Sequence, residues 1–523
     1  MDFLVHHMLR TSAIRYPNKE ALVHGSTRLT YAEVAARVTS LAHGLREAGL
    51  KRGERVGIYL EPSVPQVLSI FGVLQAGGVF VPINSLLFPQ QVGHIAKNCQ
   101  MRALITTRSK LAALAPALAD VASLNLFIVD EDQAVSDRSV PALNFQELCA
   151  LTPPAEWKDI GIEKDLAALL YTSGSTGKPK GVMLSHANIM AGATIVSTYL
   201  GITQDERILA ILPFSFDAGM NQLMTAFQQG GTLVLMTFTF AREIVQILNK
   251  ERISGLAGVP TLWNLLAQPS STMHKTKLTH LRYITNTGGA MPQPVLRVLR
   301  EILPTTKVFL MYGLTEAFRS TYLPPEELDR RPTSMGKAIP DTEILVVNES
   351  GRLCKPGEPG ELVHRGPTVS MGYWGEPELT AKMLRPNPFL PAEVIDKEKV
   401  VYSGDLVKMD EEGFLYFIGR RDTMIKTSGF RVSPTEVEEV LFQSGMAKEA
   451  AVIGIPDESL GQAIKAFVVP KDGQTFDADA LIAFCSKQVP RHMVPKVVET
   501  MEKLPKTPTG KVDYPGLRRR EGL

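Results

Sequence analysis

Residues 171–181 read Tyr171-Thr172-Ser173-Gly174-Ser175-Thr176-Gly177-Lys178-Pro179-Lys180-Gly181, and they follow an apolar run that predicts a strand over Ala167 to Tyr171. The segment holds four Ser/Thr hydroxyls, three glycines and two lysines. Glycines let backbone N–H groups converge on an anion, and hydroxyls and lysines add the donors and charge that a triphosphate needs. The pattern predicts a phosphate-binding loop made of Thr172, Ser173, Gly174, Ser175, Thr176, Gly177, Lys178 and Lys180.

The amino-acid sequence of this loop excludes a Walker A motif. That motif requires G-x-x-x-x-G-K-[ST], whereas Pro179 follows the Gly177-Lys178 pair here and Gly174 stands too close to it. The alternative is a flexible Gly/Ser turn. We regard it as the weaker interpretation, because such turns rarely carry two lysines fixed around a proline directly after an apolar strand.

Size and composition describe an ordinary globular protein with more than one domain. The chain has 523 residues, of which 44% are hydrophobic and 21% charged. Its 56 Lys/Arg and 54 Asp/Glu leave a net charge of +2, which gives no electrostatic case for nucleic-acid binding. The four cysteines lie far apart without metal-ligand spacing, which fits a reducing cytoplasm. We find no signal peptide and no apolar stretch long enough to span a membrane.

Strand and helix patterns alternate over residues 1–345, and this rhythm predicts largely parallel sheets covered by helices. Thr30, with Glu33 three residues later, predicts a capping box at a helix start. Strands are expected at Ser26–Thr30, Val56–Leu60, Val79–Ile83, Arg207–Ile211, Thr232–Met236, Gly255–Gly258, Tyr283–Thr287 and Lys307–Met311, with an apolar helix over Val67–Gly77.

The remaining third of the chain changes character twice. Residues 342–418 hold short alternating runs and many glycines, which predict a small antiparallel or barrel-like unit. After Gly419-Arg420-Arg421-Asp422 comes an α+β pattern of about 100 residues. Ser433-Pro434-Thr435-Glu436 predicts a second capping box there, strands are expected at Ala451–Ile455 and Ile464–Val469, and a helix over Ala478–Lys487. We therefore expect an α/β protein whose large N-terminal domain, residues 1–419, combines two βαβ lobes with a small barrel. A small α+β C-terminal domain would follow at residues 420–523.

Several motifs together resemble the adenylate-forming superfamily, which includes acyl-CoA synthetases, adenylation domains of peptide synthetases and luciferases. The resemblance spans nearly the whole chain, and its pieces stand in the family's order. They are YTSGSTGKPKG, Asn286-Thr287-Gly288-Gly289-Ala290, Tyr312-Gly313-Leu314-Thr315-Glu316, Tyr402-Ser403-Gly404-Asp405, Gly419-Arg420-Arg421-Asp422 and Pro505-Lys506-Thr507-Pro508-Thr509-Gly510-Lys511. It implies a large N-terminal domain of two α/β lobes and a barrel, and a small mobile C-terminal domain.

The resemblance also assigns roles in forming an acyl-adenylate from ATP and a carboxylic acid. Joining the acid to AMP brings two anions together, so cations and donors must gather at the α-phosphate. Glu316 is a plausible Mg²⁺ ligand and Thr315 a donor to the α-phosphate. Tyr312 offers a flat face to adenine, although a buried aromatic is the alternative. The other nucleotide contacts implied are Gly288, Gly289, Ala290 and Gly313, with Asp405 and Arg420 at the ribose and Arg431 at the phosphates. For Arg431 an ordinary surface ion pair is the alternative.

Lys511 is the strongest catalytic candidate, together with Thr315 and Glu316. It lies in a Pro/Thr/Gly-rich loop, where its ammonium could bridge the substrate carboxylate and the α-phosphate; a solvated tail lysine is the alternative. Asp422 falls at the family's hinge, about which the C-terminal domain swings between the two half-reactions. Thr423 departs from the family, which often has a second acidic residue there.

The identity of the carboxylic acid substrate is the part of the function that the sequence determines least. Phe216-Asp217-Ala218 follows the strand at 207–211 and resembles the segment of amino-acid adenylation domains whose aspartate binds the substrate ammonium. Asp217 could equally be the N-cap of the next helix. With Phe216 and Gly288, it forms the expected substrate pocket.

The sequence therefore predicts an AMP-forming acid–thiol ligase. It would use ATP and Mg²⁺ to adenylate a small carboxylic acid and pass the acyl group to coenzyme A or to the phosphopantetheine of a carrier protein. One alternative is a stand-alone amino-acid adenylating enzyme that loads an acyl or peptidyl carrier protein. Another is a catalytically silent scaffold of the same fold, which retention of Glu316 and Lys511 argues against. A luciferase-like oxygenase has no positive support.

Overall fold

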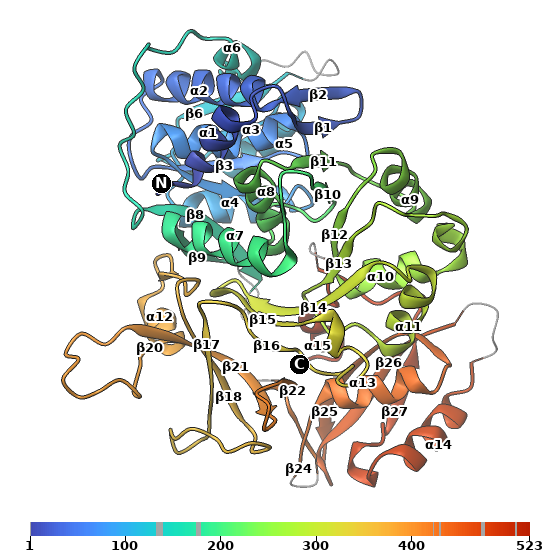
Figure 1. Ribbon diagram of the computed structural model, residues 1–523. Coiled ribbons are helices and arrows are strands. Elements are labelled where there is room, and N and C mark those ends of the chain that lie inside the picture. Colours follow the sequence, from blue (N-terminus) through green and yellow to red (C-terminus); the bar gives the residue numbers. More distant parts are fainter. Residues whose placement is uncertain are drawn as a thin grey trace.

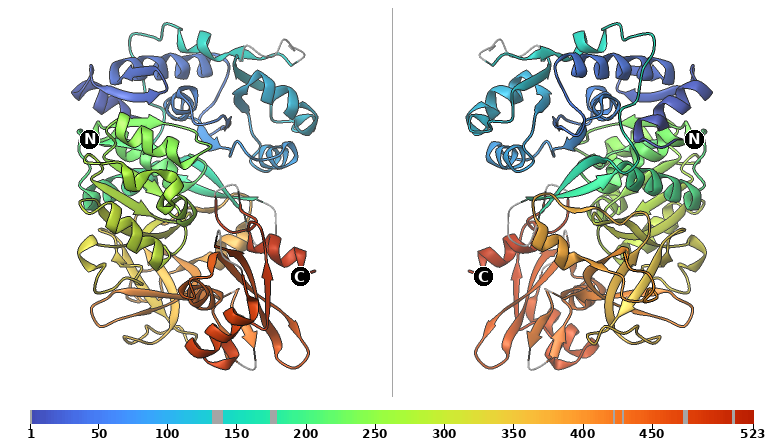
Figure 2. Two further views of the ribbon diagram at one scale, coloured as in Figure 1. Left: turned by 90° about the vertical axis from the view of Figure 1, so that its right-hand side faces the viewer. Right: turned by 90° about the vertical axis from the view of Figure 1, so that its left-hand side faces the viewer.

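The computed structural model describes residues 2–131, 140–173, 179–421, 423–427, 430–471, 476–507 and 510–523, with only the backbone of Ser173 and Arg431. These residues form four β-sheets flanked by helices (Figure 1). In both views of Figure 2 the C-terminal segment, coloured red, lies at the end of the molecule opposite the blue N-terminal elements. The mixed α/β fold predicted from the sequence is confirmed.

The largest sheet has nine strands in the order β16-β15-β14-β13-β12-β10-β11-β1-β2. Its strands β1, β10, β11, β12, β13 and β14 run parallel, and β2, β15 and β16 are antiparallel additions at the two edges. The bounds are β1 (Glu20–His24), β2 (Thr27–Thr30), β10 (Arg207–Ala210), β11 (Thr232–Leu235), β12 (Gly255–Gly258), β13 (Tyr283–Asn286), β14 (Lys307–Leu314), β15 (Ala317–Leu323) and β16 (Lys337–Ala338).

The second sheet has eight strands in the order β19-β9-β8-β4-β3-β5-β6-β7. It is parallel from β8 to β7, and β9 and β19 join it antiparallel. Its strands are β3 (Arg55–Tyr59), β4 (Val79–Pro82), β5 (Ala103–Thr107), β6 (Leu126–Asp130), β7 (Leu143–Asn144), β8 (Leu166–Ser173), β9 (Pro179–Ser185) and β19 (Gly372–Tyr373).

Two smaller sheets follow. The first is antiparallel, has five strands, and confirms the small unit predicted over residues 342–418. It contains β17 (Glu343–Val347), β18 (Gly360–Arg365), β20 (Leu384–Pro386), β21 (Lys399–Met409) and β22 (Leu415–Arg420). The last sheet contains β23 (Ile425–Thr427), β24 (Phe430–Val432), β25 (Ala447–Asp457), β26 (Gly461–Pro470) and β27 (Val497–Thr500).

The helices fill the space between and around these sheets. They are α1 (Val5–Arg15), α2 (Tyr31–Glu47), α3 (Val64–Ala76), α4 (Pro89–Asn98), α5 (Arg108–Leu118), α6 (Phe145–Cys149), α7 (His186–Leu200), α8 (Asp217–Gln229), α9 (Ala241–Lys250), α10 (Pro260–Ala267), α11 (Gln293–Ile302), α12 (Pro377–Met383), α13 (Pro434–Gln443), α14 (Ala478–Gln488) and α15 (Tyr514–Arg520). Helices α7 and α8 pack on each other; α7 contacts β8 and β9 of one large sheet, and α8 contacts β10 and β11 of the other. Buried side chains from both sheets and these helices form one continuous apolar core. No helix within the described residues is long and apolar enough to cross a lipid bilayer.

One of the two predicted capping boxes forms in the structure, and the other does not. The Thr30 hydroxyl accepts from the Glu33 N–H, and the Glu33 carboxylate accepts from the Thr30 N–H, as the capping box predicts. The prediction was wrong for Ser433. This residue is the N-cap of α13, but its hydroxyl makes no cap hydrogen bond. The Ser433 side chain is fully buried and packs against Gly419 of β22, so tertiary packing decides its rotamer.

A buried carboxyl group makes the folding stability of the C-terminal sheet depend on pH. Glu438 of α13 is 9% exposed, and its Oε1 accepts from the Val452 N–H at 2.8 Å and from the Tyr514 hydroxyl at 2.7 Å. Burial raises the pKa of Glu438 to about 7, although the two hydrogen bonds act in the opposite direction. Because the pKa is higher in the folded state than in the unfolded state, the stabilisation is complete below pH 4.5 and is lost as the pH rises to 7.

We expect Glu438→Gln to flatten this pH dependence, because glutamine keeps the acceptor oxygen and does not ionise. Relative to wild type, the variant should gain stability between pH 5 and pH 8, by roughly 1–3 kcal/mol. The apparent Tm of both proteins at each pH is the measurement. The exposed neighbour Glu439 provides the control Glu439→Gln, which should track wild type. A Tm difference that does not change with pH would contradict the prediction.

Candidate active site

The predicted phosphate loop connects two antiparallel strands. β8 runs into the loop and β9 leaves it, with Thr172 opposite Lys180 and Ser173 opposite Pro179. Thr172 and Lys180 are both partly buried, so the hairpin holds a hydroxyl and an ammonium at neighbouring positions on its two strands. Residues Gly174, Ser175, Thr176, Gly177 and Lys178 lie outside the described residues, as does the side chain of Ser173.

A second hairpin presents the predicted catalytic pair Thr315 and Glu316. These residues form the tight turn between β14 and β15, where Leu314 pairs with Ala317. The Tyr373 hydroxyl of β19 donates to Glu316 Oε1, and no described residue donates to the other carboxylate oxygen. Burial, and then the Glu316 charge, raise the pKa of Tyr373, so its hydroxyl remains a donor.

Tyr312, Asp405 and Arg420 come together beside this hairpin. Asp405 of β21 is directly opposite Arg420 of β22, and the Arg420 Nε lies 3.5 Å from the Asp405 carboxylate. The Tyr312 hydroxyl donates to the same carboxylate. One face of the Tyr312 ring stacks on His364, with ring centroids 6.1 Å apart. Burial lowers the pKa of His364 to about 3, so that ring is neutral at physiological pH.

Lys511 reaches the N-terminal part of the chain. Its Nζ lies 5.3 Å from the centroid of the Phe216 ring, and a Cβ added to Gly288 would stand 3.0 Å from the Lys511 Cε. Gly288 has φ +79°, so both its backbone conformation and this close approach favour glycine. The Thr261 hydroxyl donates to the Gly510 carbonyl at 3.2 Å and so fixes the loop that carries Lys511. The structure thus brings together three predicted site residues, Phe216, Gly288 and Lys511.

The other residues predicted to contact the nucleotide are Gly289, Ala290, Gly313 and Arg431. Gly289 and Ala290 are exposed in the turn after β13, and the Asn286 side chain donates to the Gly289 carbonyl at 2.8 Å. Gly313 lies at a bulge of β14. Arg431 lies in β24 opposite Lys426, but its side chain is outside the described residues, as is the whole of the hinge residue Asp422.

Asp217 is not the N-cap of α8. Phe216 occupies that position, and Asp217 is the first residue of the helix without a side-chain cap hydrogen bond. Asp217 is 5% exposed and makes no hydrogen bond or ion pair with any described residue. The capping alternative is therefore wrong.

The sequence reasoning missed three residues at this place. Tyr373 supports Glu316 from 57 positions further along the chain, which no local pattern could reveal. Thr287 and Arg319 are both buried, and their side chains are joined by a hydrogen bond. Arg319 did carry a signal, because it stands alone in the otherwise uncharged strand Ala317-Phe318-Arg319-Ser320-Thr321-Tyr322-Leu323.

The donor set fits a magnesium ion that would be held together with a bound nucleotide. Mg²⁺ binds through one or two carboxylates and otherwise takes phosphate oxygens and water. Glu316 offers one carboxylate oxygen without a donor from the described residues, and Tyr373 fixes the other. No cluster of acidic ligands that could hold the ion without substrate is found at this hairpin among the described residues.

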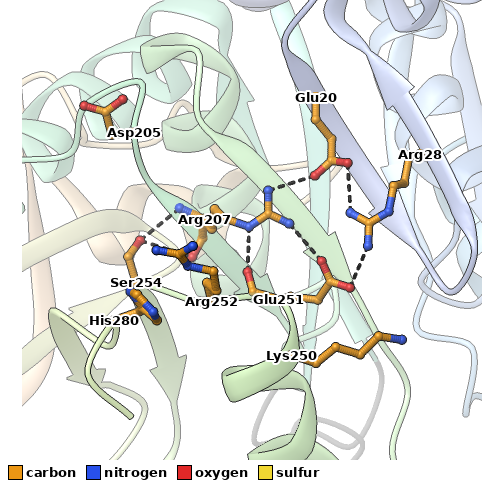
Figure 3. A pocket seen from close by; sticks show the side chains of 9 residues that line it. All are labelled: Glu20, Arg28, Asp205, Arg207, Lys250, Glu251, Arg252, Ser254 and His280. Atoms are coloured by element: carbon orange, nitrogen blue, oxygen red, sulfur yellow. Dashed lines mark hydrogen bonds and ion pairs between the residues drawn. The ribbon is translucent and has the colours of Figure 1, made fainter.

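A charged hollow of about 600 Å³ lies elsewhere (Figure 3). Arg28 and Arg207 each pair with both Glu20 and Glu251, and this network joins β1 and β2 to β10 and to the C-cap of α9. Arg207 is the first residue of β10, so the hollow is at the amino ends of the parallel strands. Ligands of open α/β sheets bind at the carboxyl ends, where Gly288 and Asp217 are found.

Comparisons with known proteins agree with this geometry. Residues 9–374 match the family model of AMP-binding enzymes, and residues 436–511 match that of the AMP-binding enzyme C-terminal domain. Feruloyl-CoA synthase from an Amycolatopsis species is 34% identical over 514 residues, which cover 97% of this chain and 96% of that protein. The long-chain-fatty-acid–CoA ligase of Bacillus subtilis (strain 168) is 30% identical over 547 residues, covering 98% and 93%.

A solved structure is similar over the same length. The crystal structure of an anthranilate CoA ligase in complex with anthranoyl-AMP superimposes with a TM-score of 0.88 at 25% identity, covering 99% of this chain and 97% of that one. The similarity therefore extends through both large sheets and the C-terminal segment.

Proposed function

Because the chain belongs to the family of AMP-binding enzymes and is an AMP-forming acid–thiol ligase, we propose that it makes the coenzyme A thioester of a small, polar carboxylic acid. ATP activates the acid as an acyl-adenylate, and coenzyme A then takes the acyl group. Carrier-protein loading is the less favoured alternative, because relatives matched over 96% and 93% of their own length are named a CoA synthase and a CoA ligase. All four cysteines are unpaired thiols, which supports a cytoplasmic location.

The residue roles that we propose follow the arrangement of the site. The loop at 172–180 holds the phosphates, Tyr312 supports the adenine, and Asp405 with Arg420 binds the ribose. Thr315 donates to the α-phosphate. Glu316 would hold Mg²⁺, whose charge would offset that of the phosphates when it is bound. Lys511 would hold the substrate carboxylate against the α-phosphate; its position beside Gly288 and Phe216, two residues of the predicted substrate pocket, supports this role.

A mobile C-terminal domain supports two half-reactions at one site. We propose a boundary at residues 419/420, with residues 1–419 as the N-terminal domain and 420–523 as the C-terminal domain, and Asp422 as the hinge. Arg431 would meet the phosphates when the C-terminal domain closes. The position of Lys511 over Phe216 supports the adenylation arrangement, and a swing about Asp422 would withdraw Lys511 and let the thiol enter.

Asp217 carries the proposal that the acid has an amino group. The residue is 5% exposed, has no hydrogen-bond or ion-pair partner among the described residues, and follows Phe216, whose ring lies under Lys511. A buried carboxylate is costly unless paired, and a substrate ammonium would pair it. The similar anthranilate CoA ligase acts on an acid that bears an amine.

We expect Asp217→Asn to remove a preference for amino acids over their des-amino analogues. Wild type should favour the amine by about 30-fold or more in kcat/KM for pyrophosphate release, since an unpaired buried charge costs several kcal/mol. The variant should treat the two acids alike. The pairs are 2-aminobenzoate with benzoate and 2-aminopentanoate with pentanoate. If wild type prefers the acid without the amine in both pairs, Asp217 has another role.

A further inference from the structure

Arg319 differs from the other buried cations of the chain. Four described lysine and arginine residues are less than 9% exposed, and Arg319 is the most buried at 4%. The other three have carboxylate partners, whereas no described carboxylate pairs with Arg319. The paired ones are Arg108 with Glu131, Arg331 with Glu327, Asp410 and Glu412, and Lys465 with Glu499 and Glu521.

The backbone at Arg319 is also unusual. Its φ is +68°, a left-handed conformation that a residue other than glycine rarely adopts within a strand. The partner strand β14 bulges between Tyr312 and Leu314, and a Cβ on Gly313 would stand 2.9 Å from the Arg319 Cα. A bulge facing a strained residue re-aims a side chain, and such strain concentrates at functional sites. Here it turns an arginine inward.

The Arg319 guanidinium uses only part of its donor capacity. Its Nη1 donates to the Thr287 hydroxyl at 3.0 Å, and its Nε is buried without a hydrogen-bond partner among the described residues. Nη2 likewise has no partner in the described part of the chain. The edge formed by Nε and Nη2 is the one that Arg52 uses for Asp165, at 2.9 and 2.8 Å. That edge matches the two oxygens of a carboxylate.

The position of this edge indicates which carboxylate it could bind. Thr287 directly precedes Gly288, against which the Lys511 side chain packs. Arg319 is therefore close to the place where we propose that the acid is activated, and its hydrogen bond goes to Thr287. A buried charge without a partner is costly in the free protein, and an anionic substrate group would remove that cost on binding.

Building on the proposed function, we propose that the acid carries a second carboxylate, which Arg319 binds through its Nε and Nη2. Lys511 serves the reacting carboxylate and Arg319 serves the spectator carboxylate. Arg319 is thus a specificity-determining residue, and the enzyme is selective for acids with two carboxylates against acids that have a methyl group in place of one.

The test uses pyrophosphate release with three pairs of acids that differ by one methyl-to-carboxylate exchange. The pairs are butanoate and succinate, 2-aminopentanoate and glutamate, and 3-methylbenzoate and isophthalate. Wild type should favour the diacid in at least one pair by about 10²-fold or more in kcat/KM, since a site built for a polar group rejects analogues that lack it. Arg319→Met should reverse that preference, and Arg319→Lys should keep part of it.

A separate readout distinguishes recognition from structural support. Removing an unpaired buried charge should leave the apparent Tm unchanged or raise it, whereas loss of a structural contact would lower it. Wild-type release with the methyl acids but not with any diacid would overturn the inference and leave the ligase function intact, whether or not the variants fold. An equal loss by Arg319→Met on both members of a pair would also overturn it. If none of the six acids supports pyrophosphate release, the result would count against both the inference and the proposed function.

Discussion

Replacing Lys511 with alanine is expected to lower the rate of acyl-adenylate formation by about 10²–10³, as removal of one preorganised charge contact usually does. The side chain contacts Phe216 and Gly288, where we propose that the substrate carboxylate and the α-phosphate meet. Thioester formation from a supplied acyl-adenylate should be spared, because the acyl–phosphate bond is already made. Single-turnover assays of the two half-reactions are the measurement.

Lys506 offers a matched control in the same loop. Its ammonium lies 3.0 Å from Glu449, within the C-terminal segment and away from Phe216. Lys506→Ala should leave both half-reactions near the wild-type rate, because an exposed ion pair of this kind contributes little. If Lys511→Ala slows both half-reactions equally, its role is general support and not charge stabilisation in adenylation.

Regular elements of this fold could be predicted from local pattern, because each depends on signals within a few residues. The strand over Gly255–Gly258 has the predicted bounds, and β8 and β13 differ from prediction by one to three residues. The Thr30 capping box needs only Thr30 and Glu33. Ser433 also has a glutamate three residues later, but its side chain makes no cap hydrogen bond, because contact with Gly419 from another sheet overrides the local preference.

The candidate site also contains residues that local sequence could predict and residues that only tertiary packing brings into place. The sequence could propose the loop at 171–181, the turn at Thr315 and Glu316, and Lys511, because glycines, hydroxyls and charges cluster in these segments. Tyr373 could not, since only the pairing of β19 with β9 brings it to Glu316. Arg319 stood out as the single charge of its strand, but the sequence could not show that no described carboxylate pairs with it, because pairing is a property of three-dimensional packing.

Glu316→Gln is the second change from which we expect a large effect. Glutamine keeps an acceptor for the Tyr373 hydroxyl but removes the negative charge that would hold Mg²⁺. Adenylation should fall by about 10²-fold or more, since metal charge stabilisation is worth several kcal/mol. The Mg²⁺ concentration that gives half-maximal rate should rise.

Two further measurements separate the charge of Glu316 from its position. Calorimetry should show that ATP binding to wild type strengthens with Mg²⁺ and that binding to Glu316→Gln does not, which is a readout independent of turnover. Tyr373→Phe keeps the charge and removes one hydrogen bond, so it should cost only about 5- to 10-fold, in line with roughly 1 kcal/mol for such a bond. If Tyr373→Phe is as damaging as Glu316→Gln, and Mg²⁺ dependence is unchanged in both, the carboxylate positions the hairpin and does not bind the metal.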